Sequence, residues 1–242
     1  MIRTTIWSPQ LRNRRDVDIY LPTNYEADAR RRYAVVYMQD GQNLADPSVA
    51  FAGTWRMDEV MDDLEAHGLE SIVVGVHNTG DRLREYSPFP DPRRGGGDAN
   101  RYLAFVADTV KPRIDRQFRT RRQASSTIVA GSSMGGLVSL YAWISRPDVF
   151  GHAGALSPSL WFGRERLFEY VDVARLPRGR LYLDVGTREG VEALADVRKM
   201  KTLLNGKAIG ERMDYREDRG GRHDEASWSR RVTWALEFLL RA

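Results

Sequence analysis

The chain has 242 residues, a formal net charge of +4 and no cysteine. This length suits one large α/β domain, and the lack of cysteine excludes a disulfide framework and a thiolate metal site. Basic residues are scattered among acids apart from short arginine-rich runs, which argues against a nucleic-acid partner. Neither a signal segment nor an apolar run of membrane-spanning length is present, so we expect a cytoplasmic protein without a membrane partner.

Alternating runs of strands and helices follow one another along the chain. Two short strands are predicted first, at 4–8 and 16–21, and the second has the alternation of an antiparallel edge strand. Further strands are predicted at 33–38, 71–77, 127–130, 152–156, 180–186 and 212–217. Helices are predicted at 55–67, 102–114, 191–204 and 225–240, with another after 127–130. This order predicts a single α/β domain over 1–242, with a mainly parallel central sheet, antiparallel N-terminal strands and helices on both faces.

A long segment between two of these elements, residues 78–100, is rich in Gly, Pro and Arg. Loops of this length in a compact domain are usually functional. We expect a lid or a substrate wall, and the alternative is a surface excursion without a function.

The most informative motif is G-x-S-x-G, which runs from Gly131 to Gly135 around Ser133. It follows a predicted strand and precedes a predicted helix, which is the context of a nucleophile elbow. The tight turn brings together the residues two before and two after the serine, so both must be small, and it raises the hydroxyl above the sheet. Ser133 is therefore the candidate nucleophile. The amide of Met134 opens the following helix, where negative charge is favoured, so it is a candidate oxyanion donor.

A second oxyanion donor is expected after the strand at 33–38, where the chain reads Asp40-Gly41-Gln42. A glycine at the carboxyl end of a central strand lets backbone amides turn toward a site, and we interpret the amide of Gln42 as that donor. The alternative is an ordinary Asp-Gly turn.

A serine nucleophile needs a base and an orienting acid, and the α/β-hydrolase order is Ser, then acid, then His. His223 follows the elbow in a loop between the last strand and the last helix, and it is the candidate base. Glu189 lies just after the strand at 180–186 and is the favoured acid. Asp184, inside that strand, and Asp196, on the next helix, remain alternatives.

The chain resembles the putative-esterase family of α/β-hydrolases, which includes esterase D-like, feruloyl and enterobactin esterases. The matching stretches are 37–44, 72–76, Arg84-Glu85-Tyr86-Ser87-Pro88, 131–136, Ser157-Pro158-Ser159-Leu160-Trp161 and 221–225. The resemblance implies the α/β-hydrolase fold, Ser133 as nucleophile, His223 as base and the amides of Met134 and Gln42 as oxyanion donors. At the acid position Glu189 stands where many relatives carry Asp.

These residues predict a serine carboxylic-ester hydrolase that acts on a small-molecule ester and requires no metal or cofactor. An acyltransferase with the same acyl-enzyme and a non-catalytic binding protein on the same fold are the alternatives. Candidate substrate-binding residues are Arg84, Tyr86, Trp161 and Arg188. Arginines at the carboxyl-end rim, with Arg82 and Arg222 among them, favour substrates with negative charge or catechol-like oxygens, unless they only form surface ion pairs.

Overall fold

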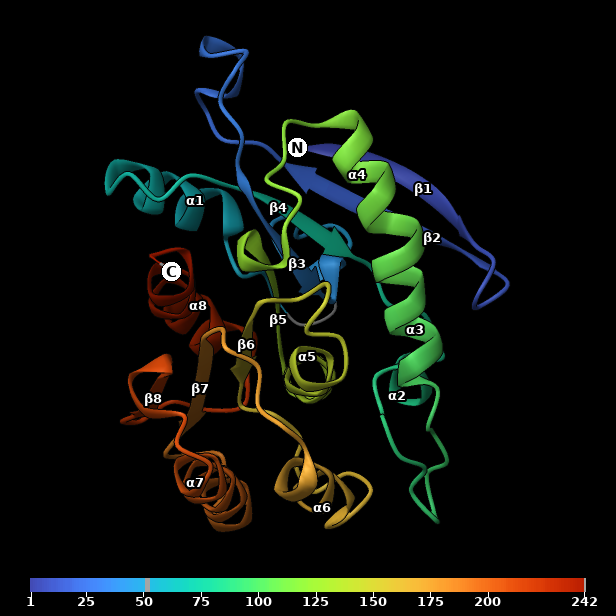
Figure 1. Cartoon of the computed structure of the whole chain (residues 1–242), viewed down its shortest axis with the longest axis vertical. Helices are drawn as coiled ribbons and strands as arrows, with labels where there is room; N and C mark the ends of the chain where they lie inside the picture. Colours follow the sequence, from blue (N-terminus) through green and yellow to red (C-terminus); the bar gives the residue numbers. More distant parts are fainter. Residues whose placement is uncertain (51–52, 242) are drawn as a thin grey trace.

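A central twisted sheet organises the computed structural model, which describes residues 1–50 and 53–241 (Figure 1). Within that part of the chain the sheet has eight strands in the order β1-β2-β4-β3-β5-β6-β7-β8. Their bounds are β1 (Ile2–Ser8), β2 (Asn13–Tyr20), β3 (Ala34–Gln39), β4 (Ser71–Val76), β5 (Thr127–Ser132), β6 (His152–Leu156), β7 (Leu181–Gly186) and β8 (Met213–Asp218). Only the pairings of β2 with β1 and β4 are antiparallel. The predicted mixed sheet is confirmed.

Helices cover both faces of this sheet, as predicted. The bounds are α1 (Met57–Ala66), α2 (Arg82–Glu85), α3 (Ala99–Phe105), α4 (Lys111–Gln117), α5 (Met134–Ser145), α6 (Arg166–Val173), α7 (Val191–Gly206) and α8 (Glu225–Leu240). Short helical segments are η1 (Tyr25–Ala27), η2 (Gly41–Asn43), η3 (Val106–Val110), η4 (Ala124–Ser126) and η5 (Gly210–Arg212), and η3 is a π-helical turn that joins α3 to α4.

Two hydrophobic cores result from the alternation of side chains along the buried strands. On β3, Val35 and Tyr37 enter the core that holds residues of α3 to α7, whereas Val36 and Met38 enter the core with α1 and α8. Successive side chains of a strand point to opposite faces, so a strand covered on both sides needs a continuous apolar run. This requirement explains why the run at 33–38 predicted its strand from sequence.

The structure differs from the predicted elements in several places. The helix predicted at 102–114 is found as α3, η3 and α4. Residues 78–100 contain α2 and an isolated bridge between Asp91 and Gly95, and the first residues of α3 fall at their end. Helix α6 was not predicted, because its eight residues bury only Leu167, Phe168 and Val171 and give a short periodic signal.

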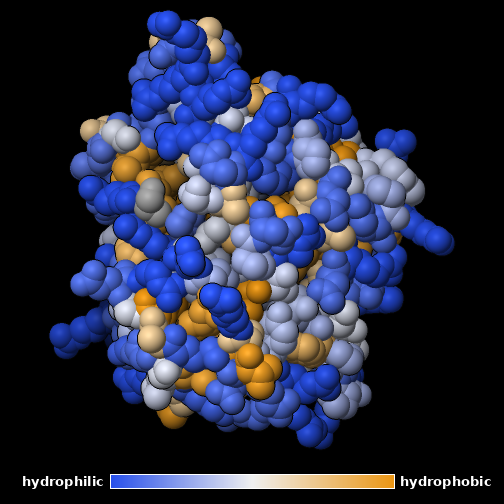
Figure 2. Space-filling view, viewed as in Figure 1, coloured by the Kyte–Doolittle hydropathy of each residue, from blue (hydrophilic) through white to orange (hydrophobic). Residues whose placement is uncertain are grey.

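Polar side chains predominate on the face of the molecule drawn in Figure 2, where hydrophobic side chains form small separate areas. This distribution agrees with strands whose apolar residues are covered by helices on both faces. In residues 1–50 and 53–241, no helix combines the length and the apolar character needed to cross a bilayer.

The turn after β3 depends on a close approach between two backbones. A Cβ atom added to Gly41 would lie 2.4 Å from the carbonyl carbon of Gly75 in β4. We therefore predict that Gly41→Ala lowers the free energy of unfolding by about 1–3 kcal/mol, the usual cost of overpacking. Urea unfolding followed by circular dichroism measures this loss.

The control is Gly206→Ala, because a Cβ atom there would meet nothing within 4 Å. Equal stability of the two variants would contradict the prediction.

Candidate active site

Ser133 occupies a strained turn between β5 and α5. Its φ is +57° and its ψ is −122°, values that a non-glycine residue rarely adopts. A Cβ atom on Gly131 would lie 2.8 Å from side-chain carbons of Gln39 and 2.9 Å from the carbonyl carbon of Gly135. The first glycine of the motif is therefore required by the close packing around the turn, and the turn has the shape expected of a nucleophile elbow.

Three side chains from separate loops form a continuous line of hydrogen bonds. Ser133 Oγ lies 2.9 Å from His223 Nε2, and His223 Nδ1 lies 2.8 Å from Glu189 Oε2. The serine follows β5, the glutamate follows β7 and the histidine follows β8. Because these strands are parallel neighbours or near neighbours, their carboxyl ends meet at one edge of the sheet. The topology thus brings together residues that are far apart in the chain.

The second carboxylate oxygen of Glu189 accepts three hydrogen bonds. Glu189 Oε1 accepts hydrogen bonds from the Gly186 amide at 2.6 Å, from Ser157 Oγ at 2.6 Å and from Arg231 Nη2 at 3.1 Å. Burial by itself raises the pKa of this carboxyl, but the bonds to His223, Ser157 and Gly186 outweigh burial and lower the pKa. The carboxyl is therefore ionised at neutral pH and acts only as an acceptor toward His223.

Behind Glu189 lies Arg231, whose side chain has no exposed surface. Its Nη1 donates to Asp184 Oδ1 at 2.9 Å and its Nη2 donates to Ser157 Oγ at 3.1 Å. Asp184 also accepts from the Ser157 amide at 3.0 Å and from the Tyr182 hydroxyl at 3.1 Å. Burial raises the pKa of Asp184 to about 7, while Arg231 acts in the opposite direction.

These contacts separate the roles of the candidate acids. Asp184 contacts Arg231, and Glu189 is the carboxylate in contact with the His223 imidazole. Asp196 lies on α7. Of the three candidate acids, Glu189 thus lies against His223, and Asp184 lies against Arg231.

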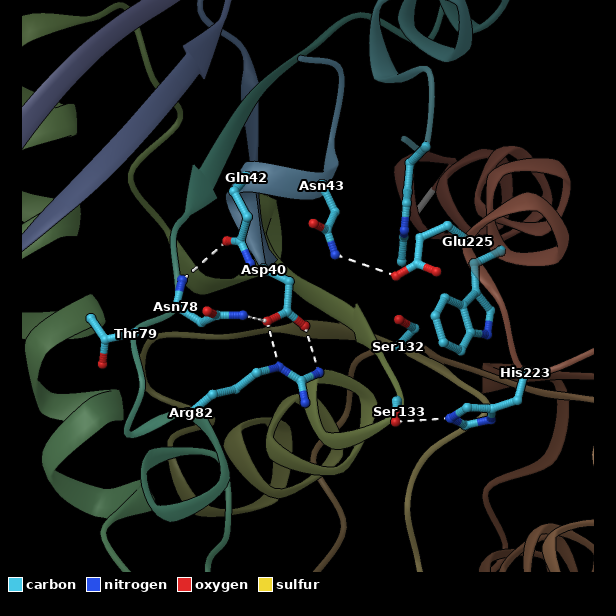
Figure 3. A pocket seen from close by; sticks show the side chains of 12 residues that line it. Asp40, Gln42, Asn43, Asn78, Thr79, Arg82, Ser132, Ser133, His223 and Glu225 are labelled. Atoms are coloured by element: carbon cyan, nitrogen blue, oxygen red, sulfur yellow. Dashed lines mark hydrogen bonds and ion pairs between the residues drawn. The ribbon is translucent and has the colours of Figure 1, made fainter. Parts of the chain in front are cut away.

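A cavity of about 470 Å³ opens in front of Ser133 (Figure 3). It is lined by Asp40, Gln42, Asn43, Trp55, Asn78, Thr79, Arg82, Ser132, Ser133, His223, Glu225 and Trp228. The two tryptophans provide apolar wall, and the remaining side chains are mainly hydrogen-bonding groups. The cavity therefore has room for a small molecule with polar substituents beside the serine.

One wall of this cavity is fixed by an ion pair. Arg82 Nε and Nη2 donate to the two carboxylate oxygens of Asp40 at 2.7 and 2.8 Å, and Asn78 Nδ2 donates to Asp40 at 2.6 Å (Figure 3). Gln42 faces the same space, and its Oε1 accepts from the Asn78 amide at 3.2 Å. The loop after β3 is thus bound to the start of the 78–100 segment, which forms part of the wall.

The other candidate substrate-binding residues do not line this cavity as the described residues define it. Arg84 forms an ion pair with Asp98 at 2.6 Å, and Arg188 is exposed after β7. Tyr86 is buried, and its hydroxyl accepts from the Asp40 amide at 3.2 Å. Trp161 is half-exposed and lies against the guanidinium of Arg94. Of these residues, Tyr86 supports the cavity from behind through Asp40.

The remaining histidines have partners elsewhere. His77 Nε2 lies 2.9 Å from Asp18 Oδ2, and His152 Nε2 lies 3.1 Å from the Ser125 carbonyl. His67 Nδ1 lies 2.8 Å from the Asp63 carbonyl. For the residues that the structure describes, no group of three or more His, Asp and Glu has the arrangement of metal ligands.

Sequence reasoning missed Arg231 and Trp228 as neighbours of the candidate site, and it placed Ser157 at this edge of the sheet without a role. Trp228 Nε1 donates to Ser157 Oγ at 3.0 Å, and Arg231 Nη2 donates to the same oxygen. Both residues lie on α8, and they orient the Ser157 hydroxyl, which donates to Glu189. A signal for Arg231 was present: it stands three residues after Trp228 and four before Ala235, on the apolar side of α8. A charged residue on such a face requires a buried partner.

Comparison with known proteins concerns the family and the fold. The model of the family described as "Putative esterase" matches residues 8–239. The chain is 28% identical over 238 residues to the uncharacterized protein YbbA of Bacillus subtilis. The alignment covers 91% of this chain and 90% of YbbA. It is 25% identical over 234 residues to the endo-1,4-beta-xylanase/feruloyl esterase of Xylanibacter ruminicola, over 94% of this chain but 30% of that protein.

A solved structure shares the fold. The IroE-like serine hydrolase of Shewanella oneidensis superposes with a TM-score of 0.79 at 23% identity, over 98% of this chain and 78% of that chain. At this identity the likeness concerns the architecture, which is the α/β-hydrolase arrangement of strands and helices.

The buried guanidinium yields a prediction about stability. Arg231→Met removes the cation between Asp184 and Glu189 and leaves both buried carboxyls without it. We expect the free energy of unfolding to fall by about 3–5 kcal/mol, as when one partner of a buried ion pair is removed. Urea unfolding measures the change.

The matched control is Arg230→Met, which removes an exposed arginine one residue earlier on α8. Its effect should stay within about 1 kcal/mol, the usual range for a surface ion pair. A similar stability for the two variants would contradict a central role of Arg231.

Proposed function

We propose a serine-hydrolase mechanism through an acyl-enzyme for this chain, which belongs to the putative-esterase family and is a carboxylic-ester hydrolase. The observation that carries the proposal is the unbroken line of hydrogen bonds from Glu189 through His223 to Ser133, beside a cavity. A nucleophile bonded to a base that is oriented by an acid is the signature of nucleophilic catalysis by serine.

In the proposed acylation, Ser133 Oγ attacks the carbonyl carbon of the ester while its proton passes to His223 Nε2. The ionised Glu189 holds the proton of His223 on Nδ1 and stabilises the imidazolium that forms. The imidazolium then gives its proton to the alcohol that leaves. In deacylation, His223 takes a proton from water, the hydroxide attacks the acyl carbon, and Ser133 recovers its proton.

Negative charge develops on the carbonyl oxygen during both steps, and two amides are the proposed donors. Met134 begins α5, so its N–H has no carbonyl acceptor within the helix. Gln42 lies in η2, after β3, and lines the same cavity as Ser133. Backbone donors held by a helix start and a short helical turn need little rearrangement when the charge appears, which is the basis of oxyanion stabilisation.

The cavity favours small esters that carry hydrogen-bonding groups. Trp55 and Trp228 offer ring surface to an aromatic or aliphatic part, and Asn78, Thr79 and Glu225 offer polar contacts. Arg82 is already paired with Asp40, so its charge is balanced within the wall. A relative named as an endo-1,4-beta-xylanase/feruloyl esterase supports a hydroxylated aromatic acyl group as the first class to assay.

The nucleophile is tested by Ser133→Ala. We expect wild-type protein to hydrolyse p-nitrophenyl and feruloyl esters and to be labelled by a fluorophosphonate probe. The variant should lose labelling, and kcat should fall by at least about 10⁴-fold. Stopped assays and mass spectrometry of the labelled protein measure these outcomes, and an added alcohol acceptor reports any acyl transfer.

Ser139→Ala serves as the control, because Ser139 is buried on α5 and its hydroxyl has no partner among the described residues. Wild-type protein that is not labelled, or a Ser133→Ala variant that keeps its turnover, would refute the mechanism.

The orienting acid is tested by Glu189→Gln. The amide no longer favours the required tautomer of His223, so kcat should fall by about 10³–10⁴-fold. Glu192→Gln removes an exposed charge at the start of α7 and should leave kcat unchanged. Steady-state kinetics on folded protein decide the question, and near wild-type turnover of Glu189→Gln would show that another group orients the imidazole.

A further inference from the structure

The proposed nucleophile has a second hydroxyl beside it. Ser133 Oγ lies 2.9 Å from His223 Nε2 and 3.1 Å from Ser159 Oγ. Ser159 belongs to the loop after β6 and is 3% exposed, so its hydroxyl is shielded from bulk water. The acyl-enzyme mechanism described above gives this hydroxyl no role.

The direction of the bond between the two serines follows from the rest of the network. Glu189 is an ionised acceptor, so His223 carries its proton on Nδ1 and presents a lone pair at Nε2. Ser133 must then give its only proton to Nε2. At 3.1 Å the remaining contact of Ser133 Oγ is therefore a hydrogen bond donated by Ser159.

Backbone contacts hold the two serines together. The Ser159 amide donates to the Ser133 carbonyl at 3.0 Å, and the Ser133 amide donates to the Leu156 carbonyl at 3.0 Å. Between them Ser157 adopts a φ of +42°, and its amide is held by Asp184. The loop after β6 is thus fastened to the elbow, and the Ser159 hydroxyl stays near Ser133 Oγ independently of His223.

We propose that Ser159 is a catalytic residue that stabilises Ser133 Oγ whenever that oxygen carries partial negative charge. The inference rests on the proposed acyl-enzyme mechanism. During acylation the O–H bond of Ser133 breaks toward His223 as the bond to the acyl carbon forms. During deacylation the bond between Ser133 Oγ and the acyl carbon breaks, and the oxygen takes a proton from His223. Ser159 keeps its own proton throughout and donates a hydrogen bond in both steps.

A role confined to the resting enzyme has a different consequence. If Ser159 only held the Ser133 side chain in its resting position, deacylation would not depend on it, because Ser133 Oγ is then an ester oxygen covalently fixed to the acyl group. The rate constant of deacylation therefore decides between the two roles. Unfolding measurements show whether a slower deacylation comes with a loss of stability, as a purely structural effect would.

The experiment uses Ser159→Ala with p-nitrophenyl acetate in a stopped-flow instrument. The burst reports acylation and the steady state reports deacylation. We expect both rate constants to fall about tenfold, the order of one net hydrogen bond, with substrate binding and Tm close to those of wild type. Ser139→Ala is the matched control, since it deletes a buried hydroxyl that has no partner among the described residues.

A folded Ser159→Ala variant with a wild-type deacylation constant overturns the inference while Ser133→Ala still tests the mechanism. If Ser159→Ala does not fold, Ser159→Cys keeps the shape of the side chain, at a slightly larger volume, with a weaker donor. Slower acylation and deacylation in the folded cysteine variant support the inference, and wild-type constants overturn it. Turnover retained by Ser133→Ala removes the mechanism itself and the inference with it.

Discussion

The architecture of the candidate active site depends on one buried cation, the guanidinium of Arg231. A buried charge is costly unless ionic and hydrogen-bonding partners surround it. Here Asp184 and Glu189 supply the opposite charge and Ser157 supplies a further acceptor. Asp184 lies on β7, Glu189 in the loop that follows β7, and Ser157 in the loop after β6. A helix near the C-terminus thus fixes the relative position of one strand and two loops.

This cation explains how two acids can lie close together with separate roles. Asp184 contacts Arg231 from within the sheet, and Glu189 contacts Arg231 with one oxygen and His223 with the other. The bonds to Glu189 lower its pKa, so it remains an acceptor for the imidazole proton. A glutamate, one methylene longer than aspartate, reaches both Arg231 and His223 from its loop.

The loop after β6 joins the two ends of the proposed triad. Ser157 donates to Glu189, and Ser159 contacts Ser133. The intervening Pro158 and the left-handed backbone of Ser157 allow two serines, two positions apart, to point in these separate directions. The cavity beside Ser133 is also lined by the ion pair of Asp40 and Arg82, which gives that wall a fixed geometry.

Much of this protein could be read from local sequence. Continuous apolar runs identify strands because a strand covered on both faces needs apolar side chains at every position, and G-x-S-x-G identifies the turn because only small residues fit around Ser133. The order of Ser133, Glu189 and His223 also follows from where loops fall between those elements. Short or irregular features, such as α6 and the helical turn within 78–100, gave too little periodicity to be predicted.

What only the tertiary structure decided is which polar groups meet. The position of Arg231 on the apolar side of α8 indicates burial but does not identify its partners. The contacts of Arg231 with Glu189 and of Ser159 with Ser133 join positions 42 and 26 residues apart. That Glu189 and not Asp184 contacts His223 likewise depends on side-chain direction at the end of a strand. The local pattern of apolar residues and glycines predicts burial and turns. Hydrogen bonds between distant loops depend on the register of strands and the packing of helices, and no local pattern specifies these.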